Sequence, residues 1–362
     1  MPNFDIVRTA HPGESFRVKS VMGTYDLQSS KTTEHFKGEI NLPGEWNVGL
    51  IVGRSGTGKT TIARELFGDC IIDGYEYTHE SILDDMPPGV SVTEITAALS
   101  AVGFASPPSW MKSYSMLSNG EKMRCDLARA ILEKREMFVF DEFTSVVDRD
   151  VAKIGSLAMQ KAIRRLGKRF IAVSCHNDIE EWLMPDWVFN TDTMSFSLHN
   201  LEEQKKNRPG IQLDIVETRR KSEYWEMFRK YHYLTGEFHK AARVWICFAN
   251  GRLAGFCSFM AFPHPKVKNY WKAHRIVVFP DYQGVGIATN MINICGKILQ
   301  DDGKRVILTS SNLAMIIALK RSPKWKCNRY GRMCASNKNT MKTFLKSNAN
   351  SRKRITAQFE MI

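Results

Sequence analysis

Residues 50–61 read LIVGRSGTGKTT, an apolar run that leads into a glycine-rich turn and then into a Lys-Thr-Thr sequence. In a strand–turn–helix unit of this kind, backbone N–H groups surround phosphates, because unpaired amides and the helix dipole favour negative charge there. The lysine of such a loop reaches the β- and γ-phosphates, and the first threonine hydroxyl binds Mg²⁺. The stretch therefore predicts a nucleotide at the carboxyl end of a strand in an α/β sheet. The predicted phosphate ligands are Gly53, Ser55, Gly56, Gly58, Lys59, Thr60 and Thr61.

A second apolar run, MFVF at 137–140, is followed directly by Asp141 and Glu142. A buried strand of this kind presents its aspartate toward the metal ion, and the adjacent glutamate can polarise the attacking water. We therefore predict Thr60 and Asp141 as the Mg²⁺ ligands and Glu142 as a catalytic residue of ATP hydrolysis.

Three further motifs follow a fixed order around this strand: LSNGE at 117–121, SVVD at 145–148, and the strand-like FIAVSCH, which ends at His176. Together with the two phosphate-site motifs they resemble the ABC-type ATPases, whose signature reads close to LSGGQ. The resemblance covers residues 15–200. Its implied contacts to nucleotide come from Ser118 and Gly120 of the signature, Asp148 of the D-loop and the switch residue His176 at the γ-phosphate.

The resemblance also implies a partner, because in ABC ATPases the signature of one cassette completes the nucleotide site of another. We expect a homodimer through the ABC domains or pairing with an ABC partner. Only 56 residues separate Thr60 from Leu117, and ESILDDMPPG at 80–89 stands where a glutamine is expected, with Asp84 or Asp85 as substitutes near the metal. Both departures, and the lack of an apolar run of about 18 residues, argue against a transporter and a membrane partner.

Two aromatic residues are candidates to stack on the adenine. Tyr25 and Phe36 both precede the phosphate loop in the chain, and each is equally well explained as part of the hydrophobic core.

The arrangement of strand-like and helical patterns predicts two domains of different topology. Before residue 200, strands alternate with helices, which predicts a mostly parallel P-loop NTPase sheet. HNLEEQKKNRPG at 199–210 is polar and ends in Pro-Gly, as expected of a boundary. After it, an Asn-Gly turn at 250–251 predicts a hairpin within a mixed, mainly antiparallel α/β sheet. We assign an ATPase domain to 1–200, a linker to 201–210 and a second domain with a basic C-terminal segment to 211–362.

A second glycine loop, YQGVGIA, lies at 282–288 after the strand-like RIVV. It lacks the Gly-Lys-Thr of the first loop and resembles the pyrophosphate loop of the GNAT acetyltransferases, Arg/Gln-x-x-Gly-x-Gly/Ala. The resemblance covers residues 211–335 and implies acetyl-CoA or another acyl-CoA as cofactor. Amides that open a helix at 287–299 would face the pyrophosphate, and the strand Arg275–Val278 would hold the pantetheine arm. The implied ligands are Val277, Val278, Gln283, Gly284, Val285, Gly286, Ile287 and Ala288.

Acyl transfer to an amine needs a base, a polarised thioester and a proton for the leaving thiolate. GNAT enzymes supply these groups from varied positions, so the loop does not identify them. Our candidates are His232 and Tyr233 in KYHYL, Asn312 after the last strand, and Tyr330 as the thiolate acid. Structural packing explains each of them equally well.

Charge separates the two halves of the chain. Residues 201–362 carry 30 Lys+Arg against 11 Asp+Glu, a balance of +19, whereas residues 1–200 carry a balance of −6. Basic residues interleaved with Trp271, Trp325, Tyr270 and Tyr330 suit phosphate neutralisation and base stacking, and coenzyme A or a solvated face would account for part of the surplus. The YHYL stretch and the basic surface resemble Mom-type phage enzymes, which modify DNA bases, and this favours a nucleic-acid partner.

Three functions remain open at this point. The first is an ABC ATPase–acyltransferase that modifies a base of DNA or RNA. The second is acetylation of a protein lysine or small amine, as in a toxin or resistance factor. The third is an ATP-dependent nucleic-acid clamp whose GNAT fold is not catalytic. The eight cysteines form no CxxC pair, and MPNFDIVRTAHPGESF lacks a signal-peptide core, so we expect reduced thiols in a cytoplasmic protein.

Overall fold

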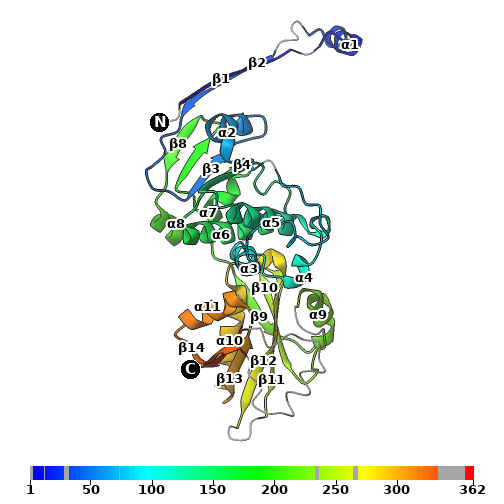
Figure 1. Cartoon of the computed structure of the whole chain (residues 1–362), viewed down its shortest axis with the longest axis vertical. Helices are drawn as coiled ribbons and strands as arrows, with labels where there is room; N and C mark the ends of the chain where they lie inside the picture. The colour runs from blue at the N-terminus through cyan, green and yellow to red at the C-terminus, as the bar shows by residue number, and fades with distance from the viewer. Residues whose placement is uncertain are drawn as a thin grey trace. The chain divides into compact units, whose positions relative to one another are not determined.

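The structure is a computed structural model that describes residues 3–11, 13–27, 32–72, 74–232, 236–263, 268–332 and 355–362. The chain divides into two compact units (Figure 1). Unit 1 comprises Met1–Tyr75 and Lys134–Arg208, and unit 2 comprises Glu76–Glu133 and Pro209–Ile362. The sequence assigned residues 76–133 to the ATPase domain, whereas the structure groups this segment with the C-terminal part of the chain.

Unit 1 is built on a parallel sheet with helices between its strands, as the sequence predicted. Its described strands follow the order β4-β5-β6-β3-β7-β8, and only β8 runs antiparallel to its neighbour. These strands are β3 (Val48–Val52), β4 (Ile71–Ile72), β5 (Met137–Phe140), β6 (Arg169–Ser174), β7 (Trp187–Asn190) and β8 (Ser195–Leu198). The helices are α2 (Lys59–Phe67), α6 (Arg149–Leu166), α7 (Glu180–Leu183) and α8 (Leu201–Asn207), with 3-10 turns η1 (Gly68–Cys70) and η3 (Asn177–Ile179).

A two-stranded antiparallel ribbon completes unit 1. It pairs β1 (Asn3–Ala10) with β2 (Thr32–Glu39), and α1 (Phe16–Thr24) connects them at the far end of the ribbon in Figure 1. Phe4 and Phe36 of the ribbon enter the core of the unit together with Trp187 and Phe189 of β7. The ribbon is therefore anchored to the sheet at one end by aromatic packing.

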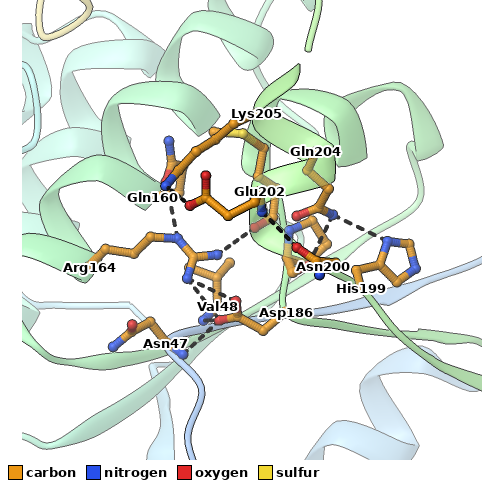
Figure 2. A network of polar contacts seen from close by, with 12 residues as sticks. Asn47, Val48, Gln160, Arg164, Asp186, His199, Asn200, Glu202, Gln204 and Lys205 are labelled. Carbon is orange, nitrogen blue, oxygen red and sulfur yellow. Dashed lines mark hydrogen bonds and ion pairs between the residues drawn. The ribbon is translucent and has the colours of Figure 1, made fainter. Parts of the chain in front are cut away.

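The predicted linker 201–210 contains α8, which polar contacts attach to unit 1 (Figure 2). Asn200 caps this helix by accepting from Glu202 N at 2.9 Å, and Gln204 donates to Pro185 O at 3.1 Å. In the same view, Arg164 donates to both oxygens of Asp186, and Asp186 Oδ2 also accepts from Asn47 N and Val48 N at the start of β3. The polar composition that predicted a linker thus belongs to an N-capped surface helix, and the unit boundary follows Arg208.

Unit 2 contains a mixed sheet. Its described strands follow the order β14-β15-β13-β12-β11-β10-β9, in which only β12 and β13 pair in parallel. They are β9 (Leu213–Glu217), β10 (Arg243–Ala249), β11 (Arg252–Ala261), β12 (Tyr270–Val278), β13 (Arg305–Ser310), β14 (Trp325–Arg332) and β15 (Ile355–Met361). The predicted hairpin turn joins β10 and β11, with φ of 49° at Asn250 and 79° at Gly251. The mixed, mainly antiparallel topology is confirmed.

Helices of unit 2 come from two parts of the chain. The C-terminal part supplies α9 (Lys221–Phe228), α10 (Ile287–Asp301) and α11 (Leu313–Arg321), with 3-10 turns η4 (Arg229–Tyr231) and η5 (Pro280–Tyr282). Residues 76–133, which we call the signature segment, supply α3 (Val92–Ala101), α4 (Pro107–Trp110), η2 (Tyr114–Met116) and α5 (Asn119–Leu132). The helix predicted from YWEMFRKYHYL ends earlier, at Phe228, and Tyr233 lies outside the described residues.

Candidate functional sites

The first glycine loop joins β3 to α2, as the sequence predicted. Gly53, Gly56 and Gly58 have φ of 158°, 84° and 83°. A Cβ on Gly58 would lie 2.5 Å from the Phe36 ring, so only glycine fits this backbone at the N-cap of α2. The first turn of α2 contains no acidic residue, which leaves its amides and the helix dipole available to an anion.

Lys59 and Thr60 open the helix that follows this loop. The Lys59 ammonium donates to Arg54 O at 2.7 Å, so the side chain folds back over the loop. The Thr60 hydroxyl donates to Asp141 Oδ1 at 3.2 Å, which joins the first turn of α2 to the end of β5. Of the other predicted ligands, Thr61 accepts from Arg8 Nη1 of β1 at 2.7 Å, and Ser55 is exposed.

The Thr60 hydroxyl and the Asp141 carboxylate are oxygen ligands of the kind that Mg²⁺ prefers. The described residues hold no group of three or more His, Cys, Asp or Glu side chains that would bind a metal ion. A Mg²⁺ ion at this position would therefore take two protein ligands and complete its shell with phosphate oxygens and water, as is usual for this ion. The residues present fit the ion.

Glu142 follows Asp141 in a left-handed backbone conformation with φ of 53°, which is uncommon for a residue with a side chain. Its N–H donates to Asp141 Oδ1 at 2.9 Å, and its carbonyl accepts from Ser145 N and Ser145 Oγ. These contacts hold the strained backbone and leave the carboxylate exposed.

His176 and Asp148 follow neighbouring strands. Since β3, β5 and β6 are parallel, the residues that follow them meet at one edge of the sheet, so His176 and Asp141 share the edge of the first glycine loop. His176 is half-buried and its N–H donates to Ser174 Oγ at 3.1 Å. Asp148 caps α6 by accepting from Asp150 N at 3.0 Å.

The two adenine candidates lie in different environments. Phe36 is buried in the core of unit 1 against the loop glycine. Tyr25, at the end of α1, is 71% exposed. Phe36 is therefore a core residue, and Tyr25 remains a prediction.

The signature motif forms the start of α5 in unit 2. Ser118 is the N-cap, and it exchanges two hydrogen bonds with Glu121: the serine hydroxyl accepts from Glu121 N, and the Glu121 carboxylate accepts from Ser118 N. This capping box accounts for glutamate where the family has glutamine, since either side chain can close it. Gly120 is buried in the first turn.

Two tyrosines from outside α5 form a network with Asp126 of that helix. The rings of Tyr77 and Tyr114 stack with centroids 3.9 Å apart, and their hydroxyls donate to Asp126 at 2.8 and 2.7 Å. Burial raises the pKa of Asp126 to about 6, although the two hydroxyls act in the opposite direction.

At Asp85, one of the two predicted glutamine substitutes, the carboxylate is buried and accepts from Thr78 N and His79 N.

The second glycine loop joins β12 to α10 in unit 2. Gly284 and Gly286 have φ of 84° and 96°, and a Cβ on Gly286 would meet no atom within 4 Å. Gly286 is the N-cap of α10, whose first turn contains no acidic residue. Here glycine is required by the backbone angle, and the open space beside it suits a bound anion.

The strand before this loop separates from its parallel neighbour. β12 pairs with β13 only over Tyr270–Lys272, whereas Ala273 and residues 275–278 pair with β11 alone among the described strands. The edge of β12 that ends in Val277 and Val278 therefore faces a split between two strands. A split of this kind exposes backbone N–H and C=O groups that an extended amide-containing arm can pair with.

The side chain of Gln283 is already engaged. Its Nε2 donates to Val278 O at 2.8 Å, and its Oε1 accepts from Ala105 N of the signature segment at 2.7 Å. This side chain fixes the loop in place, so that ligand contacts fall to the backbone of the loop.

The predicted acyl-transfer residues lie on different elements. His232 is buried, with its ring 5.6 Å from that of Trp225. Asn312 caps α11 by accepting from Met315 N at 3.0 Å. Tyr330 on β14 is 53% exposed and lies under the Lys320 ammonium, 3.5 Å from its ring centroid.

His274, on the strand before the second glycine loop, was not among the site candidates identified from the sequence. His274 occupies a bulge of β12, where the register with β11 shifts, and its Nε2 accepts from His239 N at 3.2 Å. Burial, together with the charge of Arg275, lowers the pKa of His274 to about 4, so the ring is neutral at pH 7. A histidine in an apolar strand before a glycine loop was the available signal.

Part of the predicted basic and aromatic surface is structural. Trp325 is buried and donates to Asn293 Oδ1 at 2.7 Å, and Tyr270 lies beneath Arg305, 4.9 Å from its guanidinium. Residues 333–354, with their basic side chains and Cys334, lie outside the described residues. The described cysteines are all free thiols.

Comparison with known proteins finds similarity to two classes of protein, and the match to one of them crosses the unit boundary that follows Arg208. The acetyltransferase (GNAT) family model matches residues 176–321. The sn-glycerol-3-phosphate import ATP-binding protein UgpC of Ruegeria sp. (strain TM1040) is 26% identical over 210 residues, which cover 48% of this chain and 57% of that protein. The spermidine/putrescine import ATP-binding protein PotA of Vibrio vulnificus (strain YJ016) is 24% identical over 217 residues, which cover 51% of this chain and 54% of that protein. The chain thus spans about half the length of the curated relatives it matches.

Among solved structures, the ribosomal-protein-S18-alanine N-acetyltransferase from Escherichia coli is similar at 15% identity and a TM-score of 0.30, covering 42% of this chain and 93% of that one. Across the described residues, no helix has the length and apolar character to cross a membrane. The N-terminal half of the chain is thus similar to ABC-type ATP-binding proteins, and the C-terminal half contains most of the match to the GNAT family model. These two families imply ATP and an acyl-coenzyme A as cofactors.

Proposed function

We propose that this protein hydrolyses ATP in unit 1 and transfers an acyl group from acyl-coenzyme A, bound in unit 2, to an amine of a nucleic-acid base. The observation that carries the proposal is the pair of glycine loops at strand–helix junctions of two different sheets. Each ends at a glycine N-cap with φ near 90° and opens a helix without acidic residues in its first turn. Two separate phosphate sites suit two cofactors with different tasks.

In unit 1, the loop amides and Lys59 would hold the phosphates, and Thr60 and Asp141 would hold Mg²⁺. Mg²⁺ supplies charge neutralisation at the phosphates. Glu142 would accept a proton from the attacking water, and His176 would contact the γ-phosphate. This assignment is supported by the hydrogen bond from the Thr60 hydroxyl to Asp141, which joins the two proposed Mg²⁺ ligands.

In unit 2, the backbone of residues 284–288 would bind the coenzyme pyrophosphate, and the free edge of β12 would hold the pantetheine arm. The acceptor nitrogen forms a bond to the acyl carbon and loses a proton, while the carbon–sulfur bond breaks and the thiolate takes up a proton. Tyr330 is the candidate acid because its exposed ring leaves the hydroxyl accessible. His232 is the candidate base, and its buried ring would need a path to the acceptor.

The proposal of a nucleic-acid acceptor rests on the positive charge of the C-terminal half. The balance of +19 over residues 201–362 exceeds what one coenzyme A would neutralise. A base acceptor would be single-stranded or flipped out of its duplex. We further propose that two cassettes meet through their signatures in a homodimer or with an ABC partner, in the cell interior where both cofactors are made.

The test is incubation of the purified protein with isotopically labelled acetyl-CoA, ATP and either single-stranded DNA, duplex DNA, RNA or a lysine peptide. We expect label in a nucleoside after digestion and mass spectrometry, and none with the Gly286→Val variant. Label in the peptide alone would favour a protein acceptor. Binding of nucleic acid without label, with coenzyme A bound, would favour a non-catalytic clamp.

A further inference from the structure

The signature segment packs directly on the second glycine loop. α5 contacts η5, the turn that immediately precedes the loop. Arg124 of α5 donates to Asp281 O at 3.3 Å and pairs with the Asp281 carboxylate at 3.6 Å. Together with the bond from Ala105 N to Gln283, these contacts hold the segment against the residues at the end of β12.

Arg124 shows that this contact belongs to the folded core of unit 2. Its side chain is 1% exposed. A buried guanidinium is tolerated where a carboxylate and hydrogen bonds compensate its charge. Loss of Asp281 would therefore leave the buried Arg124 without this compensating carboxylate. The segment and the loop therefore fold against each other as one body.

The same segment also reaches the other side of the split. α3 contacts α11, the helix that follows β13. Between them lies a pocket of about 260 Å³, lined by Ala97 and Ser100 of α3, Trp110 of α4, and the turn at Asn312 and Leu313. The segment thus touches the carboxyl ends of both strands that form the split.

The position of this pocket suggests its ligand. In the proposed function, the pantetheine arm lies along β12 and the pyrophosphate lies at residues 284–288, beyond the end of that strand. The adenosine end of coenzyme A follows the pyrophosphate, so it must extend past the strand ends, where the signature segment lies. The pocket combines hydroxyl and amide groups with an aromatic and aliphatic surface, which suits a heteroaromatic base and its ribose.

We propose that the signature segment of the ATPase forms one wall of the acyl-coenzyme A site, and that the pocket between α3, α4 and the start of α11 holds the adenosine end of the coenzyme. This inference rests on the proposed function, which places the pyrophosphate at the second glycine loop. It makes the coenzyme site composite, because the glycine loop comes from the GNAT-family sequence and the adenosine wall comes from the segment that carries the ATPase signature.

Two probes and three variants test the inference by isothermal titration calorimetry on the full chain. The probes are coenzyme A and 4′-phosphopantetheine, which lacks the adenosine end. Ala97→Trp fills the pocket from an exposed position on α3, and Val92→Trp adds the same side chain at an exposed position of α3 that does not line the pocket. Gly286→Val disrupts the pyrophosphate loop.

We expect Ala97→Trp to weaken coenzyme A binding at least tenfold and to leave 4′-phosphopantetheine binding within twofold of wild type. Val92→Trp should bind both probes as wild type does, with unchanged circular dichroism for both tryptophan variants. Wild-type affinity of Ala97→Trp for coenzyme A would overturn the inference while the proposed function stands. A wild-type chain that binds neither probe, or a Gly286→Val variant that binds both normally, would overturn the proposed function and the inference with it.

Discussion

At the scale of single residues, the two cofactor sites depend on different side chains that can be changed one at a time. Lys59 and Glu142 belong to unit 1, whereas the second glycine loop, the proposed coenzyme site, belongs to unit 2. Lys59→Ala removes the charge that faces the phosphates, and Glu142→Gln removes the proposed proton acceptor. We expect ATP turnover to fall at least about 100-fold in each variant, the range typical of a lost catalytic group.

Coenzyme A affinity serves as the control for this pair, and it should stay within about twofold of wild type because neither residue belongs to unit 2. Steady-state phosphate release and calorimetry give the two readouts. Simultaneous loss of both activities would mean that the two units are not functionally separable.

Gly286 is the second residue-scale test. A valine at φ of 96° is strained, and its branched side chain would cover the amides that open α10. We expect coenzyme A affinity to fall at least about tenfold, since the loop amides are the proposed ligands of the pyrophosphate. Gly303→Val is the matched control, because Gly303 follows the other end of α10, has φ of 73°, and a Cβ added there would also meet no atom within 4 Å. A similar loss in both variants would point to strain in α10 rather than to the loop.

At the scale of elements, α5 has a pH-sensitive contribution to stability. The pKa of Asp126 is about 6 in the folded chain, above its ordinary value of 3.8. The folded state therefore holds an extra proton between about pH 4 and pH 6, and the stability from this group falls as pH rises through that window. Asp126→Asn removes this effect. Relative to wild type, the variant should gain about 2 kcal/mol in unfolding free energy on going from pH 4.5 to pH 7.5.

Urea unfolding of both proteins at the two pH values measures this difference. Tyr77→Phe should have the opposite effect on the pH dependence of stability. It removes a hydrogen bond that lowers the pKa of Asp126, so stability should fall more steeply as the pH rises. Parallel pH profiles for wild type and Asp126→Asn would show that this carboxyl does not titrate as described.

At the scale of the whole molecule, the proposed pairing of two cassettes predicts a nucleotide-dependent change of mass. Glu142→Gln should retain ATP without hydrolysing it, and we expect this variant to double its molar mass with ATP and Mg²⁺ in light scattering. A further Ser118→Arg change places a large cation at the N-cap of α5 and should prevent the increase. A constant mass with bound ATP would contradict self-association and favour a separate ABC partner.

The positions of the main motifs in the fold were predictable from local sequence. The first glycine loop, Asp141 with Glu142, and the second glycine loop lie at strand–helix junctions because apolar runs, glycines and helix caps act over a few residues. The Asn-Gly hairpin at 250–251 follows from backbone angles for the same reason. The roles of Asn312 and His232 were less predictable, because capping and core packing use the same residue types as catalysis.

Two glycine loops at strand–helix junctions of two different sheets follow from the amino-acid sequence alone, because each loop needs only its own glycines and the neighbouring strand and helix. The grouping of residues 76–133 with the second sheet emerges only in the folded chain. It depends on contacts between residues far apart in the sequence, such as Arg124 with Asp281 and Ala105 with Gln283. No local pattern encodes such pairs, since a buried arginine and a backbone N–H acquire their partners only when the two segments fold against each other.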